Sequence, residues 1–172
     1  EDTTGFYYEC KVGSANSFNI GLAQYGEAQD SDHGGNSAFS FLFGCSDGGI
    51  EEGDDGFVAN GTWDSDGQGA ISSGDYAVLA MKGGAMWVGE VAASGGAVNW
   101  YNGATTAEIN ADTTGNAMFT GMTGKGWFPY VRRGGGSASS GLFNFGATAY
   151  ANTDVPTGLL NINTTNIAAE TT

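Results

Sequence analysis

Short alternations of hydrophobic and polar residues run along this chain, and their period of two is typical of β-strands. Residues 6–12 place Glu9 and Lys11 on one face and apolar side chains on the other. Residues 17–23 alternate in the same way, after a turn at 13–16. The two segments are therefore predicted to pair as an antiparallel hairpin.

The most apolar run lies at 76–81 and predicts a central strand that is covered on both faces. Gly83 and Gly84 follow it and predict a tight turn into a strand at 85–88, which makes a second hairpin. Further short strands are predicted at 38–43, 57–59, 128–132, 141–145 and 159–162. The aromatic residues expected in the core of these strands are Trp87, Trp127, Phe128, Phe143 and Phe145.

Polar stretches separate the strands and are predicted to be loops, at 24–37, 46–56 and 92–115. The chain has 31 glycines, and glycine costs about 1 kcal/mol per helical position relative to alanine. No helix is therefore predicted. Many short strands without a helix indicate an all-β chain, built as a two-sheet antiparallel β-sandwich or a barrel. A length of 172 residues suits one domain over residues 1–172.

The order of these segments resembles the SPRY domain, a concanavalin-like β-sandwich of the jelly-roll type. Residues 5–9 are similar to the opening strand of that family, which carries glycine, aromatics and glutamate. The other similar segments, in order, are 20–23, 73–76, 128–131 and 144–146. The resemblance implies a single SPRY-like sandwich over nearly the whole chain. The family strand expected before Gly5 is missing, so the chain is expected to be part of a longer one or processed at its N-terminus.

The second half is most similar to the SPRY-like domains of structural proteins in tailed bacteriophages. Those domains carry, in order, a Phe-Thr-Gly step, a Phe-Pro-x-Val strand, Asn-Phe-Gly, a proline two residues before a glycine, and an Asn-Thr-rich tail. The matching segments here are 119–121, 128–131, 144–146, 156–158 and 163–166. Residues 80–84 and 88–91 depart from the family pattern at hairpin ends, which affects a shared ligand more than the fold.

The net charge of −14, with five lysines and arginines in total, argues against nucleic acid as a partner and against insertion at an anionic membrane surface. The resemblance then implies a module on the virion surface, outside the cell, that binds host glycan or protein through its loops. It would act as a tail-fibre, receptor-binding or capsid-decorating domain. Other virion proteins or further copies of this chain are expected as partners, with a trimer as one homo-oligomer. Two alternatives remain open: a purely structural packing domain, and a secreted lectin-like domain.

Catalytic spacing is what an enzyme on this fold would need, and the sequence lacks it. A glycosidase on a concanavalin-like sandwich places its carboxylates on alternate residues of one strand. No Glu-x-Asp-x-Glu pattern occurs, and the single histidine, His33, lies in a polar loop. The chain is therefore expected not to be an enzyme, and no catalytic residue is assigned.

Binding residues are instead predicted on the loops and beside them, because exposed aromatic and polar side chains contact sugars and proteins there. They are Tyr25, Asp30, His33, Trp63, Trp100, Tyr101 and Arg132. For Trp63, Trp100 and Tyr101 a role in closing the end of the sandwich is an equal alternative. For Arg132 the alternative is a salt bridge to a neighbouring loop.

No cofactor is expected, and calcium is the one ion that the sequence raises. Asp64 and Asp66, with a glycine after them, supply oxygen ligands, but the stretch lacks the full twelve-residue calcium loop. Cys10 and Cys45 leave two possibilities. A disulfide between them would close a loop of about 35 residues and stabilise by about 4 kcal/mol, or both remain buried thiols.

Overall fold

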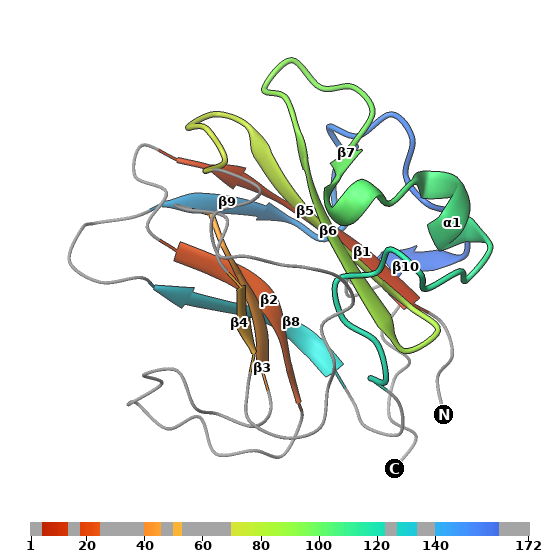
Figure 1. Cartoon of the computed structure of the whole chain (residues 1–172). Helices are drawn as coiled ribbons and strands as arrows, with labels where there is room; N and C mark the ends of the chain where they lie inside the picture. Colours follow the sequence, from red (N-terminus) through yellow and green to blue (C-terminus); the bar gives the residue numbers. More distant parts are fainter. Residues whose placement is uncertain are drawn as a thin grey trace, which may run out of the picture.

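A computed structural model describes residues 5–13, 18–24, 40–45, 50–52, 70–122, 127–133 and 140–161. The chain is all-β, as predicted, and its strands form two sheets (Figure 1). The strands are β1 Gly5–Val12, β2 Phe18–Gln24, β3 Ser40–Gly44, β4 Ile50–Glu52, β5 Tyr76–Lys82, β6 Ala85–Val91, β7 Asn99–Trp100, β8 Trp127–Arg133, β9 Gly141–Asn144 and β10 Leu159–Asn161. The described helical elements are the 3₁₀ turn η1 Tyr101–Gly103 and the helix α1 Thr106–Asn110.

Five strands of the larger, six-stranded sheet lie in the order β10-β1-β5-β6-β7, and the sixth, β9, also pairs with β1. Along one edge β1 pairs antiparallel with β5. Its other edge is shared by two short strands: β10 pairs with its first residues in parallel, and β9 pairs antiparallel with its last ones. The four-stranded sheet has the order β4-β3-β2-β8, with antiparallel neighbours. The β1–β10 pair is thus a parallel exception to the antiparallel prediction.

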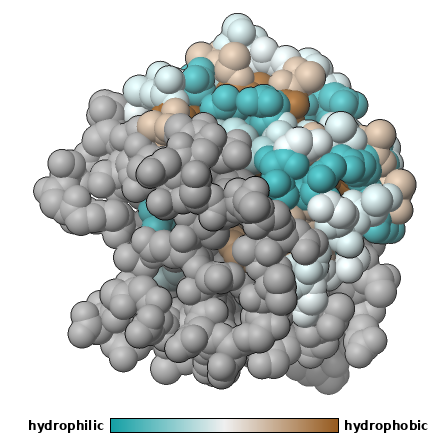
Figure 2. All heavy atoms as spheres, viewed as in Figure 1, coloured by the Kyte–Doolittle hydropathy of each residue, from teal (hydrophilic) through white to brown (hydrophobic). Residues whose placement is uncertain are grey.

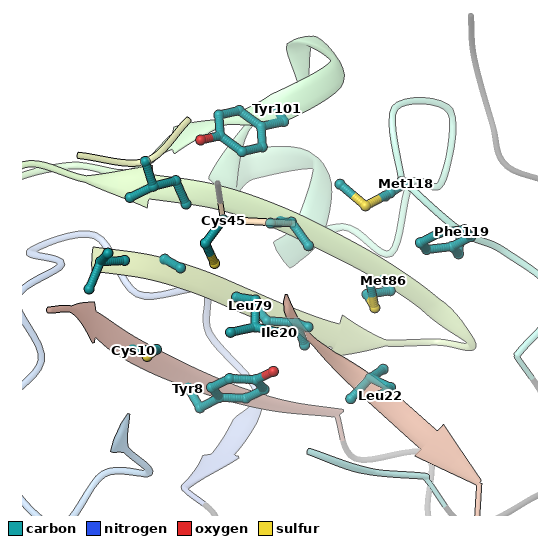
Figure 3. Close-up of a cluster of buried hydrophobic side chains, with 14 of the residues drawn as sticks. Tyr8, Cys10, Ile20, Leu22, Cys45, Leu79, Met86, Tyr101, Met118 and Phe119 are labelled. Atoms are coloured by element: carbon teal, nitrogen blue, oxygen red, sulfur yellow. The ribbon is translucent and has the colours of Figure 1, made fainter. Parts of the chain in front are cut away.

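A hydrophobic core lies between the two sheets. Tyr8 and Cys10 enter it from β1, and Ile20 and Leu22 enter it from β2 in the other sheet (Figure 3). All four side chains are fully buried. Because both sheets contribute to one cluster, each supplies the apolar cover that the inner face of the other needs.

Strand β5 has apolar cover on both of its faces, as predicted. Leu79 belongs to the core between the sheets, whereas Val78 and Ala80 belong to a second cluster on the outer face, which is the face turned away from the four-stranded sheet. The turn after β5 is the predicted one. Gly83 and Gly84 have φ values of +55° and +74°, which suit the two-residue turn of an antiparallel hairpin.

A third layer covers the outer face, built from α1 and the loops on either side of it (Figure 1). Trp87 and Trp100 from the sheet pack there with Ile109 of α1. Seen from this side, the described surface is mostly hydrophilic or neutral, with small hydrophobic patches (Figure 2). Of the predicted core aromatics, Trp87 is buried, and Trp127, Phe128, Phe143 and Phe145 are partly buried.

The hairpin predicted from residues 6–12 and 17–23 is wrong. The two segments are β1 and β2, which lie in different sheets and face each other across the core. Alternation shows which face of a strand is apolar, but it does not show which strands pair along its edges. Alternation therefore identifies the strands but not their partners.

Four elements lie where loops were predicted: β4 within 46–56, and β7, η1 and α1 within 92–115. Strand β4 falls within the acidic stretch 46–56 and pairs with β3. Helix α1 falls within 92–115 and begins with a capping box, in which Thr105 and Glu108 each bond to the backbone amide of the other. A threonine three residues before a glutamate is the sequence signal for such a start. The strand predicted at 57–59 lies outside the described residues.

Candidate functional site

Glu9 of β1 is a buried carboxylate, 1% exposed, on the outer face of the sheet. The Tyr7 hydroxyl donates to Glu9 Oε1 at 2.9 Å. The backbone amides of Ala151 and Asn152 donate to Oε2 and Oε1 at 2.7 and 2.9 Å. A buried carboxylate needs such donors to offset the loss of water. Glu9 thereby fixes segment 150–152 to the outer face.

Two tyrosines complete the surroundings of Glu9. The Tyr150 ring meets the Tyr7 ring edge-on, with centroids 4.8 Å apart, and its hydroxyl donates to the Tyr7 carbonyl at 3.2 Å. Burial and then the charge of Glu9 raise the pKa of Tyr7, and the same two causes raise the pKa of Tyr150 to about 12. Both tyrosines therefore remain neutral donors at physiological pH, and the cluster acts as a structural clamp.

A second polar group lies inside the core between the sheets. The Tyr8 hydroxyl donates to the Gly21 carbonyl of the opposite sheet at 3.0 Å. Burial, followed by the nearby Cys10 and Cys45, raises the pKa of Tyr8. Burial also raises the pKa of the Cys10 thiol to about 12. Cys10 and Cys45 are both buried thiols, which is the second of the two arrangements considered above (Figure 3).

Trp100 and Tyr101 are interior residues, which corrects their prediction as an exposed binding surface. They are 6% and 4% exposed. The Trp100 indole donates to Thr106 Oγ1 at 3.0 Å, and the Tyr101 hydroxyl donates to Glu90 Oε2 at 3.2 Å. Burial and then Glu90 raise the pKa of Tyr101. Their polar neighbours Asn99 and Asn102 donate to Glu90 and to the Asn116 carbonyl, and the rings close the core.

Three side chains form a row on the outer face, two of them exposed and the third, Tyr76, partly buried. Lys11 of β1 is exposed, Leu142 of β9 lies opposite it, and Tyr76 of β5 lies opposite it on the other side. The Lys11 ammonium lies 5.5 Å from the centroid of the Tyr76 ring, a cation–π distance. We call these residues the Lys11 row. It combines a cation, an aromatic ring and an aliphatic side chain that is 73% exposed.

The sequence did not single out the Lys11 row. Alternation along β1 places Lys11 on the face opposite the core. Its neighbours come from β5 and β9, however, and only the strand register brings them together. An isolated lysine in an alternating strand therefore carries no signal of a site by itself.

Most of the other predicted site residues lie outside the described part of the chain. They are Tyr25, Asp30, His33, Trp63 and the calcium candidates Asp64 and Asp66. Arg132 is placed on β8, opposite Asn19 of β2, and its side chain is outside the description. Within the described ranges, no cluster of three or more His, Cys, Asp or Glu residues could hold a metal ion. None of the helices described is long and apolar enough to cross a membrane.

Comparisons with known proteins leave the family open. No protein-family model matches the chain, and no curated protein matches it.

Proposed function

We propose that this chain is a non-enzymatic binding module on the surface of a bacteriophage virion, where it attaches to host glycan or protein. The source of the proposal is the order of the segments similar to phage SPRY-like domains. Several of them have defined structural roles: residues 5–9 begin β1, and 128–131 lie in β8. Asn144 Oδ1 accepts the Gly146 amide at 3.0 Å and so shapes the turn after β9.

The proposed finer fold is the SPRY-type jelly roll. Two sheets that share one core support it, together with the antiparallel pairing of β1 with β5 and of β5 with β6. The shared edge of β1, with parallel β10 and antiparallel β9, is a specific feature that a close structural relative should reproduce.

The observation that carries the binding role is the Lys11 row. The outer-face residues Tyr7, Glu9 and Trp87 are buried, whereas this row leaves a cation and a leucine open to solvent. Tyrosine is enriched at binding surfaces, and here its ring lies beside a cation and an exposed aliphatic side chain. The predicted contacts of the loop at 24–37 and of Trp63 remain part of the proposal.

Packing between virion subunits is the alternative role, with further copies or other virion proteins as partners. The segment 92–115, which is rich in small residues, would suit such packing. Several large side chains of that segment cover the chain's own sheet instead, among them Trp100, Tyr101 and Ile109. Surface for a neighbouring subunit would have to come from other residues, so the binding role is the better supported one.

Two measurements test the binding role. Antibodies raised against the chain should label intact, purified virions, and the fluorescently labelled chain should adsorb to host cells in a saturable way. Absence of the chain from purified virions would overturn the virion assignment. Labelled virions together with a chain that adsorbs to no host surface would favour the packing role.

A further inference from the structure

We propose that the Lys11 row binds a sugar residue that carries a single carboxylate, as a terminal unit on an otherwise neutral glycan. This rests on the proposed function and names the ligand class of its site. Neighbouring strands are separated by about 4.8 Å, so three side chains across β9, β1 and β5 span about 10 Å. That is the footprint of one or two sugar rings.

Lys11 is exposed because the segment that covers the outer face ends at Glu9, two residues before it on β1. Tyr7 and Glu9 precede Lys11 on the same face of β1 and are 0% and 1% exposed. The amides of Ala151 and Asn152 hold the covering segment at Glu9. Lys11 is exposed two residues further on. A ligand on the Lys11 row would therefore rest beside a rigid, hydrogen-bonded rim.

Among the described residues, no carboxylate forms an ion pair with Lys11. The ion pair in this part of the chain is that of Lys82 with Asp112, at 3.3 Å. Lys82 also donates to the Asn110 carbonyl at the end of α1, at 2.9 Å. Lys11 instead lies over the Tyr76 ring, which holds an ammonium without removing its charge or its hydrogen-bond donors. The Lys11 ammonium is thus positioned by the Tyr76 ring and can still donate hydrogen bonds to a carboxylate of a ligand.

The number of charges on the ligand follows from the charge of the protein. Lys11 is the one cation of the row, and the chain has a net charge of −14. A second negative group on a ligand would therefore be repelled by the protein instead of forming another ion pair. A polyanion or a strongly acidic protein is therefore disfavoured. A monocarboxylated sugar places one charge at Lys11 and its apolar C–H face on Leu142, whose side chain is 73% exposed.

The test titrates the intact chain with methyl glucuronide and, separately, with neutral methyl glucoside, by NMR at low salt. The glucuronide should give saturable shifts at Lys11 and at the methyl groups of Leu142, and high salt should weaken them. Lys11→Gln should weaken binding about tenfold, since it removes one charged hydrogen bond. Lys11→Arg should keep most of the affinity.

Leu142→Ser and Leu160→Ser form the matched pair. Both leucines are exposed, at 73% and 41%, and both lie on short strands that pair with β1. Only the change at Leu142 should weaken binding of the glucuronide. Circular dichroism of all variants checks that each one is folded.

Three results would overturn the inference. One is no saturable binding of the glucuronide up to about 20 mM, and another is unchanged affinity in Lys11→Gln. The third is tighter binding of polyglutamate than of the glucuronide, which would assign the row to an acidic polypeptide. If Lys11→Gln still adsorbs fully to host cells, the ligand assignment falls while the proposed binding module stands.

Discussion

The hydroxyl of Tyr8, on β1, donates a hydrogen bond of 3.0 Å to the carbonyl of Gly21, on β2, and so joins the two sheets across the core. Tyr8 is fully buried, so the bond is shielded from water. A polar link at this place fixes how the sheets sit on each other, which apolar packing alone specifies less sharply.

Tyr8→Phe should lower the free energy of unfolding by about 1–3 kcal/mol, because it leaves the buried Gly21 carbonyl without its donor. Urea denaturation followed by fluorescence measures the change. Tyr76→Phe is the control, since the Tyr76 hydroxyl makes no hydrogen bond to the described residues and should cost little. Equal effects of the two substitutions would show that the link between the sheets is not stabilising.

Glu9→Gln tests the clamp on segment 150–152. The substitution keeps the shape but replaces a carboxylate oxygen by an NH₂ group, which would face backbone amides that donate at 2.7 and 2.9 Å. Hydrogen bonds to a charged group contribute about 1.5–3 kcal/mol each, so we expect a loss of at least about 2 kcal/mol. Hydrogen exchange should accelerate most at the amides of Ala151 and Asn152.

Glu108→Gln provides the comparison for Glu9, because Glu108 also accepts a backbone amide, that of Thr105, but at an exposed position. Its effect on global stability should be well under that of Glu9→Gln. Unchanged exchange at residues 151 and 152 in Glu9→Gln would contradict the role of Glu9 as a clamp.

Much of the strand pattern could be predicted from local sequence, because it depends on neighbours in the chain. The β5–β6 hairpin is an example: an apolar run, then Gly83 and Gly84 at positive φ, then a second strand. The partner of β1 could not be predicted in this way. Its register with β9 and β10 joins residues from opposite ends of the chain, and no local pattern encodes such a choice.

The candidate site shows the same limit. Trp100 and Tyr101 have polar neighbours, which suggested exposure. In the fold Asn99 donates to Glu90 Oε1 at 3.3 Å and Asn102 donates to the Asn116 carbonyl at 3.4 Å, while both rings are buried. The Lys11 row was missed for the converse reason, because its members become neighbours only when three strands are in register.

Gly89 is required by a close approach of β7 to β6. A Cβ atom at this position would lie 2.6 Å from Val98 Cγ1 and 2.7 Å from the Asn99 carbonyl oxygen. Gly89→Ala should therefore destabilise by about 2 kcal/mol or more, since backbone atoms cannot move away cheaply. Gly115→Ala is the control, because a Cβ there meets nothing within 4 Å. Thermal unfolding of the two variants measures the difference. Equal melting temperatures for Gly89→Ala and Gly115→Ala would contradict the close approach of β7 to β6.

Alkaline pH should destabilise the fold through the buried Cys10 thiol. Burial raises its pKa from about 9 to about 12. Between these values the unfolded chain loses the thiol proton while the folded chain keeps it. The unfolded state then binds fewer protons, so stability falls as pH rises, by about 1.4 kcal/mol per pH unit for one such group. Below pH 9 this contribution is fully present.

Cys10→Ala removes that titration, so its free energy of unfolding should fall less steeply between pH 9 and 11 than that of the wild type. Val12→Ala is the matched control: Val12 lies on the same face of β1 and is equally buried, but does not titrate. It should lower stability at every pH and leave the alkaline slope unchanged. The raised pKa values of Tyr7, Tyr8 and Tyr101 add to the slope in all three proteins. Guanidinium denaturation at several pH values measures the slopes, and parallel curves for wild type and Cys10→Ala would show that the thiol is not the group responsible.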